Sequence, residues 1–166
     1  MKIRIGHGYD VHAFSDEKTI ESSLEESIVL GGVKIPFKKL LLAHSDGDVL
    51  LHALCDALLG ALALGDIGTH FPDTNQRYKS FDSKKFLRQV MKLVFDKGFR
   101  LSNADISIVA QEPKMSSYIS QMRKNISLET GVDIEDISIK ATTTEKLGFV
   151  GRGEGISCHA VVLISS

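Results

Sequence analysis

Residues 3–12 read Ile-Arg-Ile-Gly-His-Gly-Tyr-Asp-Val-His, and the alternation that begins with Ile3 and Ile5 predicts a β-strand. Side chains alternate across a strand, so Asp10 and His12, which are two residues apart near its end, point to the same side. An Asp-x-His pair in this position offers two ligand atoms to one metal ion. We therefore expect a strand here that carries half of a metal site.

The other elements follow from the spacing of apolar residues and from the glycines that end them. A hairpin is expected over residues 28–36, because Gly31-Gly32 supplies the positive φ of a tight turn. Three helices are expected at 48–64 before Gly65, from Asp82 or Ser83 up to Gly98, and at 116–130 before Gly131. Further strands are expected around 106–110, at 137–143 and at 156–164.

This order predicts an α+β fold of two layers, with three helices on one face of a mixed sheet. The 166 residues suit a single catalytic domain, 1–166. The strand at 156–164 is too apolar for a sheet whose second face meets solvent, and a buried oligomer interface would explain it. Residues 15–27 are acidic and poor in apolar side chains, so we interpret them as a solvated loop, with a short exposed helix as the alternative.

Bulk composition argues against several classes of protein. Hydrophobic residues make up 43% and charged residues 25% of the chain, which is typical of a globular protein. The formal net charge of -1 argues against binding nucleic acid through bulk electrostatics. We see no secretory signal and no apolar run long enough to span a membrane. Cys55 and Cys158 lie in apolar stretches and make no disulfide framework, so we expect a reducing, cytoplasmic location.

The third ligand of a metal site has to come from another element, and His52 is the best candidate. It interrupts an apolar helical stretch, with Asp48 and Asp56 four residues before and after it on the same helix face. A nearby carboxylate can fix the tautomer of a ligating histidine. Together with Asp10 and His12, two imidazoles and one carboxylate leave a fourth position open, which is the pattern of catalytic zinc. The alternative stays open, since a lone helical histidine is more often a satisfied core residue.

Two further stretches combine polar residues with glycine. Residues 44–48, His-Ser-Asp-Gly-Asp, precede the first helix and form either an ordinary capping loop or a mobile loop that places His44 against an anionic substrate. Residues 65–74 contain Asp66 and Asp73, which can hydrogen-bond a polyol, although a well-made turn would have the same composition.

The C-terminal third contains candidate phosphate-binding loops. Consecutive N–H groups and hydroxyls of residues 142–149 can cradle phosphate oxygens. Glu145 is a candidate ligand for a hard cation such as magnesium. Residues 151–155 place Arg152, a side chain that recognises phosphate bidentately, in a glycine-rich turn. None of these stretches identifies a reaction by itself.

Together the stretches resemble one family, the 2-C-methyl-D-erythritol 2,4-cyclodiphosphate synthases, in order and over nearly the whole chain. The matching segments are 5–12 (IGHGYDVH), 41–49 (LLAHSDGDV), 52–54 (HAL), 65–68 (GDIG), 71–73 (FPD), 113–115 (PKM), 140–149 (KATTTEKLGF) and 151–155 (GRGEG). The resemblance implies a zinc ion on Asp10, His12 and His52. It also implies a second ion, Mg²⁺ or Mn²⁺, held by Glu145 at a diphosphate.

The resemblance further implies a substrate site with two parts. His44 and Thr143 match catalytic positions that stabilise the transition state. The wall around the methylerythritol part is expected at Asp66, Ile67, Gly68, Phe71 and Asp73. The cytidine pocket is expected at Ala110, Pro113, Lys114, Met115, Ser116, Ala141 and Thr142. Further substrate contacts are expected at Asp10, His12, His44, Ser45, Thr143 and Glu145, with Phe149 and Arg152 near a subunit interface.

The implied reaction belongs to a lyase of non-mevalonate isoprenoid biosynthesis that works as a homotrimer with active sites between subunits. In 4-diphosphocytidyl-2-C-methyl-D-erythritol 2-phosphate, the 2-phosphate attacks the β-phosphorus and CMP leaves. Divalent ions offset the repulsion between the anionic groups, and a folded substrate makes the attack intramolecular. No cytidylyltransferase domain is fused on, so we expect the cyclase alone. A zinc-dependent phosphohydrolase and an inactive trimeric binding module are the alternatives.

Overall fold

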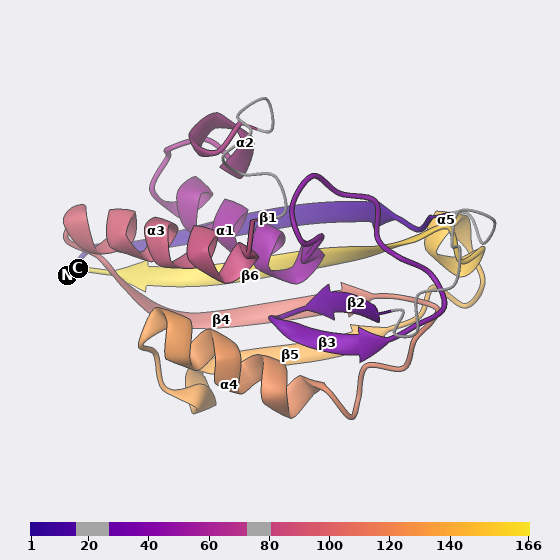
Figure 1. The fold of residues 1–166 in the computed structure, drawn as a ribbon. Coiled ribbons are helices and arrows are strands. Elements are labelled where there is room, and N and C mark those ends of the chain that lie inside the picture. Colours follow the sequence, from indigo (N-terminus) through magenta and orange to yellow (C-terminus); the bar gives the residue numbers. More distant parts are fainter. Residues whose placement is uncertain (16–26, 73–80) are drawn as a thin grey trace.

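The computed structural model describes residues 1–15, 27–72 and 81–166 (Figure 1). Its elements, in chain order, are β1 (Ile3–Ala13), β2 (Ser27–Leu30), β3 (Val33–Pro36), α1 (Val49–Ala61), α2 (Ile67–His70), α3 (Ser83–Asp96), β4 (Arg100–Val109), α4 (Ile119–Thr130), the 3-10 turn η3 (Ile134–Asp136), β5 (Ile137–Thr142), α5 (Gly148–Gly151) and β6 (Gly155–Ser165). Every strand and long helix that the sequence predicts is therefore present. The acidic segment within 15–27 lies almost entirely outside the described residues.

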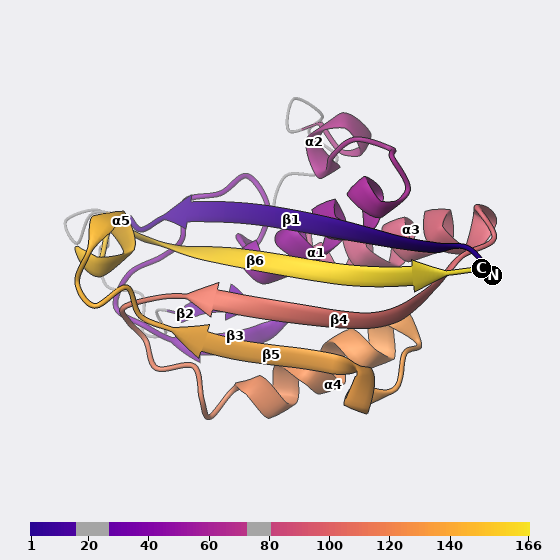
Figure 2. The ribbon, with the colours of Figure 1, turned by 180° about the vertical axis from the view of Figure 1, so that it is seen from behind.

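The main sheet has four strands in the order β1-β6-β4-β5. β6 runs antiparallel to both β1 and β4, while β4 and β5 are parallel, so the sheet is mixed as predicted. Figures 1 and 2 show α1, α3 and α4 together on one face of this sheet. The hairpin of β2 and β3 forms a separate two-stranded sheet, and its turn uses Gly31 and Gly32 with φ of 57° and 69°. The α+β, two-layer prediction is confirmed.

The helix α1 lies unusually close to β1, because two glycines of the strand face it. A Cβ built on Gly8 would stand 2.0 Å from the carbonyl oxygen of Ala53, and one on Gly6 would stand 1.8 Å from that of Ala57. Only glycine allows the backbones to approach so closely. This contact fixes the spacing between the strand that carries Asp10 and the helix behind it.

Two helix boundaries differ from the prediction. The first helix ends at Ala61 rather than at Leu64, because Ala63 takes a left-handed φ of 57° and reverses the chain before Gly65. The third begins at Ile119 rather than at 116, and no side chain caps it. The three preceding residues belong instead to a loop. The short helices α2 and α5 carried no periodic signal that sequence could reveal.

The strand β6 separates a buried face from an exposed one. Ile156, Cys158, Ala160, Val162 and Ile164 are all at most 1% exposed beneath the helices. On the opposite face of the sheet the apolar side chains of Ile3, Ile5, Tyr9, Val11 and Val161 are 42–70% exposed. Cys55 and Cys158 are buried free thiols, as expected. Within the described ranges, no helix has the length and hydrophobicity needed to cross a membrane.

Candidate active site

Asp10, His12 and His52 converge on one point, as the sequence predicts. Asp10 Oδ2 lies 3.0 Å from His52 Nδ1 and 3.1 Å from His12 Nε2, and the two imidazole nitrogens are 3.3 Å apart. Asp10 and His12 come from neighbouring same-side positions of β1, and His52 comes from the first turn of α1. Two imidazole nitrogens and one carboxylate oxygen within 4.8 Å of one another fit a divalent metal ion.

The electrostatics of this trio suit a cation. Burial opposes ionisation of Asp10, but hydrogen bonds from His12 and His52 outweigh it and hold the pKa of the carboxyl well below its usual range. Burial likewise opposes protonation of His12, but the hydrogen bond to Asp10 prevails and raises its pKa. The result is an ionised carboxylate between two polar rings, which is an anionic donor set for a divalent ion.

Each histidine has a partner on the nitrogen that faces away from the trio. His12 Nδ1 lies 3.1 Å from the carbonyl oxygen of Leu42, which can only accept, so the neutral His12 ring carries its hydrogen on Nδ1 and its lone pair on Nε2. His52 Nε2 lies 2.8 Å from Ser83 Oγ and 3.2 Å from Ser45 Oγ. Both rings are thereby oriented as metal ligands.

The sequence-based partners of His52 were wrong. Asp48 is fully buried, but its carboxylate accepts hydrogen bonds from the backbone of Gly31, Gly32 and Leu51 at 2.7–3.0 Å. Asp56 accepts from the backbone N–H of Ile67 at 2.7 Å. The two carboxylates therefore fasten α1 to the β2–β3 turn and to α2, because the backbone N–H groups beside them need acceptors.

A cavity of about 290 Å³ opens beside the trio. Its lining combines both histidine ligands with the predicted polyol wall: His12, His44, Ser45, His52, Ile67, Gly68, Phe71 and Phe86. Phe86 was not predicted as a site residue, although its place on the apolar face of α3 pointed inward. Asp66 caps α2 at the edge of this region, where its Oδ1 accepts from the N–H and hydroxyl of Thr69, both at 2.8 Å. Asp73 lies outside the described residues.

A second cavity, of about 230 Å³, gathers the residues expected at cytidine. Its lining is Ala110, Gln111, Pro113, Lys114, Met115, Ser116, Ile119, Ala141, Thr142 and Thr143. They meet because β4 and β5 are parallel, so that the chain leaves both strands at the same end, where the Ala110 N–H donates to the Thr142 carbonyl at 3.0 Å. Gln111 and Ile119 were missed by sequence reasoning.

The loop after β5 carries the candidate ligand of a second ion. Thr143 Oγ1 donates to Glu145 Oε1 at 3.0 Å, and Glu145 itself has a left-handed φ of 50°. Arg152 forms a two-point ion pair with Glu154 at 2.6 and 3.1 Å, next to the half-exposed Phe149 of α5. Phe149 and Arg152 line neither of the two cavities described above.

The structure does not bring the two catalytic candidates into one cavity. His44 lines the cavity at the metal trio, whereas Thr143 lines the cavity beside β5. Since β1 and β5 are the opposite edges of the main sheet, the two halves of the expected site lie toward opposite edges of that sheet.

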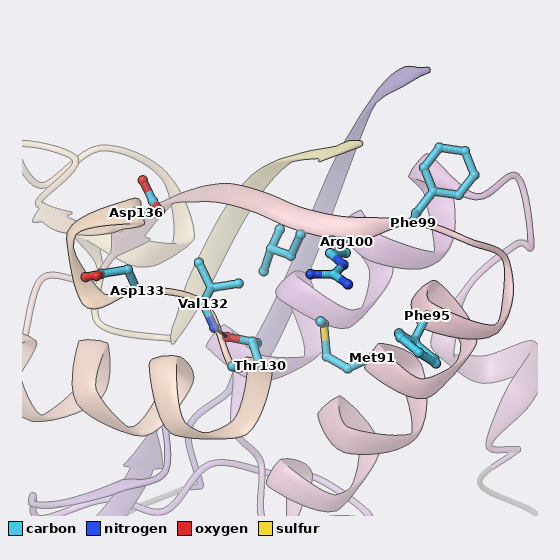
Figure 3. Close-up of a pocket in the computed structure, with 10 residues that line it drawn as sticks. Met91, Phe95, Phe99, Arg100, Thr130, Val132, Asp133 and Asp136 are labelled. Atoms are coloured by element: carbon cyan, nitrogen blue, oxygen red, sulfur yellow. Dashed lines mark hydrogen bonds between the residues drawn. The ribbon is translucent and has the colours of Figure 1, made fainter. Parts of the chain in front are cut away.

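A further cavity, of about 430 Å³, lies away from both (Figure 3). It is built from α3, the start of β4 and the turn after α4, with Phe95 toward one end and Asp133 and Asp136 toward the other. Its lining contains no histidine and no residue of the metal trio. The size of this cavity is therefore no evidence that it takes part in the chemistry of the trio.

Known proteins resemble this chain over its full length. Residues 3–165 match the model of the YgbB family. The 2-C-methyl-D-erythritol 2,4-cyclodiphosphate synthase of Thioalkalivibrio sulfidiphilus is 57% identical over 164 residues, which are 99% of this chain and 98% of that protein. The protein of the same name from Azotobacter vinelandii is 58% identical over 162 residues, which are 98% of each chain.

Solved structures agree with the sequence relatives. The bifunctional IspDF of Campylobacter jejuni is 43% identical with a TM-score of 0.89, and the match covers 98% of this chain but only 42% of that longer one. IspF of Plasmodium falciparum, solved as a CDP complex, is 41% identical with a TM-score of 0.82 over 98% of this chain and 95% of that one. Fold, metal trio and full-length identity lead to the same conclusion: the chain belongs to the YgbB family, that of the 2-C-methyl-D-erythritol 2,4-cyclodiphosphate synthases.

Proposed function

We propose that this chain converts 4-diphosphocytidyl-2-C-methyl-D-erythritol 2-phosphate into 2-C-methyl-D-erythritol 2,4-cyclodiphosphate and CMP. It would thus be a lyase of non-mevalonate isoprenoid biosynthesis. The observation that carries the proposal is the convergence of Asp10, His12 and His52 at the wall of a cavity, in a chain 57% identical to a relative named for this reaction. We further propose that residues 1–166 act as one catalytic domain in the cytoplasm.

Zinc is the ion that we propose for the trio, because two imidazoles and one carboxylate leave it an open position. Bound there, it supplies Lewis-acid polarisation of a phosphate oxygen. The chain's own part is to orient the substrate. Ile67, Gly68 and Phe71 offer an apolar wall for the methylerythritol carbons, and Ser45 offers a hydroxyl beside the trio. His44, exposed on the neighbouring loop, is proposed to stabilise the transition state together with Thr143.

The second cavity is proposed to hold the cytidine. Ala110 and Met115, both buried, line it together with Pro113, Lys114 and Ser116. A nucleotide ligand is supported by the Plasmodium falciparum relative, whose structure is a CDP complex. Glu145, oriented by Thr143, is proposed to hold Mg²⁺ or Mn²⁺ at the diphosphate, because carboxylate oxygens suit these hard ions.

The separation of the two cavities supports a homotrimer with active sites between subunits. The edge strands β1 and β5 are three strand spacings apart, which is about 14 Å. A site that joins the metal trio of one copy to the cytidine cavity of the next is complete only in an assembly. The exposed apolar side chains of Ile3, Ile5 and Val161 on the uncovered sheet face provide surface that such an assembly would bury.

A subunit-mixing experiment tests this arrangement. His52→Ala removes a metal ligand and Glu145→Ala removes the proposed second-ion ligand, so each variant alone is expected to be inactive. When equal amounts of the two are unfolded together and refolded, about a quarter of all sites combine two intact halves and activity should return to that level. No recovery in mixed trimers of confirmed composition would show that each subunit uses its own two halves. Zinc bound to His52→Ala as tightly as to the parent would refute the metal trio.

The runner-up is a zinc-dependent phosphohydrolase that shares the trio but uses water as the nucleophile. The same cavity would admit water, so geometry alone favours neither nucleophile. The relatives' names favour cyclisation.

A further inference from the structure

The imidazole of His52 is backed by a chain of hydrogen bonds that no sequence pattern suggested. Ser83, the first residue of α3, is fully buried and places its Oγ 2.8 Å from His52 Nε2. The same hydroxyl donates to Asp46 Oδ1. The backbone N–H of Ser83 donates to the other carboxylate oxygen, Asp46 Oδ2, at 3.0 Å. The carboxylate of Asp46 is thus bound at two points by a single residue.

The direction of these hydrogen bonds is set by valence. An ionised carboxylate only accepts, so the single hydrogen of the Ser83 hydroxyl is directed at Asp46. The oxygen that faces His52 therefore offers a lone pair, and His52 Nε2 must supply the hydrogen. His52 Nδ1, which lies 3.0 Å from Asp10 Oδ2, would then present its lone pair to a cation bound at the trio, whereas without a cation Asp10 competes with Ser83 for the ring hydrogen. Ser45 Oγ, which accepts from the Gly47 N–H at 3.3 Å, can act as a second acceptor for the same nitrogen.

We propose that Asp46 and Ser83 are positioning residues that hold His52 in its Nε2–H tautomer with Nδ1 directed at the metal. The inference rests on the proposed metal role of the trio and deepens it. It also explains how the loop of residues 44–48 is placed. Asp46 lies two residues after His44, and its N–H donates to the carbonyl of Phe81 at 3.3 Å. The Asp46 carboxylate therefore connects His52, a ligand of the proposed metal site, to the loop that carries His44.

A purely structural role for Asp46, as a cap of α3, is the competing explanation. The cap position is already filled, since the side chain of Asp82 accepts from the N–H of Lys84 at 2.9 Å. Asp82 has no hydrogen bond to His52 among those of the described residues. Asp82→Ala is therefore a matched control that removes this cap and weakens the start of α3 without touching the imidazole.

The test uses ¹⁵N-labelled, zinc-loaded full-length protein, because zinc on Nδ1 removes the competition of Asp10 for the ring hydrogen. ¹H–¹⁵N spectra of the imidazole report the Nε2–H of His52 and its exchange with water. The parent and Asp82→Ala should show an Nε2–H that exchanges slowly. Ser83→Ala should show faster exchange, and Ser83→Thr, which keeps a hydroxyl, should restore the parent signal.

Asp46→Asn provides a sharper outcome. The Ser83 N–H requires an acceptor, so the amide oxygen should face it and the amide NH₂ should face Ser83 Oγ. The hydroxyl hydrogen is then released toward His52 Nε2, where it opposes the Nε2–H form that leaves Nδ1 free for the metal. Zinc affinity, measured by competition with a chelator, should fall 10- to 100-fold in Ser83→Ala and at least as far in Asp46→Asn.

Parent-like Nε2–H exchange and zinc affinity in both variants would overturn the positioning role. A loss of affinity equal to that of Asp82→Ala would do the same, because it would mark a general effect on α3. The proposed function fails separately: if His52→Ala keeps full zinc affinity, the trio is not the metal site. If His52→Ala loses zinc while Ser83→Ala keeps it, only the positioning role is wrong.

Discussion

The contact between β1 and α1 makes a quantitative prediction about Gly8→Ala. The added Cβ would stand 2.0 Å from Ala53 O and 2.6 Å from Ala57 N, whereas real Cβ contacts are essentially never under 3.0 Å. The helix must therefore move away by about 1 Å, since both obstacles are rigid backbone. Such overpacking costs about 3 kcal/mol in the free energy of unfolding. Moving α1 also moves His52, and metal ligands tolerate errors of only about 0.2 Å.

The matched control is Gly60→Ala, also at the interface of α1 with β1. There the nearest atom to the new Cβ is His7 O at 3.8 Å, which is ordinary contact, and replacing a helical glycine should stabilise the fold by up to about 1 kcal/mol. Urea unfolding of the zinc-free proteins measures both effects, and chelator competition measures zinc affinity. If Gly8→Ala matched Gly60→Ala in stability and kept its zinc, the close-contact reasoning would be refuted.

Further predictions concern the carboxylates of α1. Asp48→Ala leaves buried amides of the β2–β3 turn without acceptors and should cost about 3 kcal/mol in urea unfolding, whereas an effect under about 1 kcal/mol would contradict its clamping role. Burial raises the pKa of Asp48 to about 6, so the folded chain binds this proton more tightly than the unfolded chain. The free energy of unfolding should therefore fall as the pH rises from about 4 to about 6, and Asp48→Asn should lack this part of the slope. Asp56→Ala frees the Ile67 N–H and loosens α2, so KM should rise several-fold at unchanged zinc content, and an unchanged KM would show that α2 needs no such anchor.

The metal trio was predictable from sequence because each member follows a local rule. Alternation on a strand sets Asp10 and His12 on one side, and an interrupted apolar pattern marks His52. Asp48 and Asp56 were assigned to His52 by the same kind of local rule, their spacing of four residues on the helix, and this assignment was wrong. Helix spacing shows which side chains are near one another, but it does not show which backbone groups lack partners.

The true partner of His52 was beyond local reasoning. Ser83 is 31 residues away from His52, and only the packing of α3 against α1 brings its hydroxyl to the imidazole. The end of α1 was misplaced for a related reason. Residues 62–64 continue the apolar pattern, but the left-handed backbone at Ala63 ends the helix, and nothing in an alanine side chain signals that conformation.

The second cavity is an intermediate case. Its parts lie in the loop after β4 and at the end of β5, and their likeness to a known family predicted them as one pocket. The physical cause is the parallel pairing of β4 with β5, which sends both chain exits to the same end. Gln111 was missed because it lies between conspicuous motifs and belongs to none.

The most direct test of the cyclase reaction follows the phosphorus atoms. The zinc- and magnesium-loaded protein is incubated with 4-diphosphocytidyl-2-C-methyl-D-erythritol 2-phosphate in ¹⁸O-enriched water, and the products are observed by ³¹P NMR and mass spectrometry. Intramolecular attack predicts CMP together with a product whose two phosphorus atoms are coupled in one diphosphate and carry no ¹⁸O. A linear product with two separate monophosphate groups, one containing ¹⁸O from water, would contradict cyclisation and establish hydrolysis.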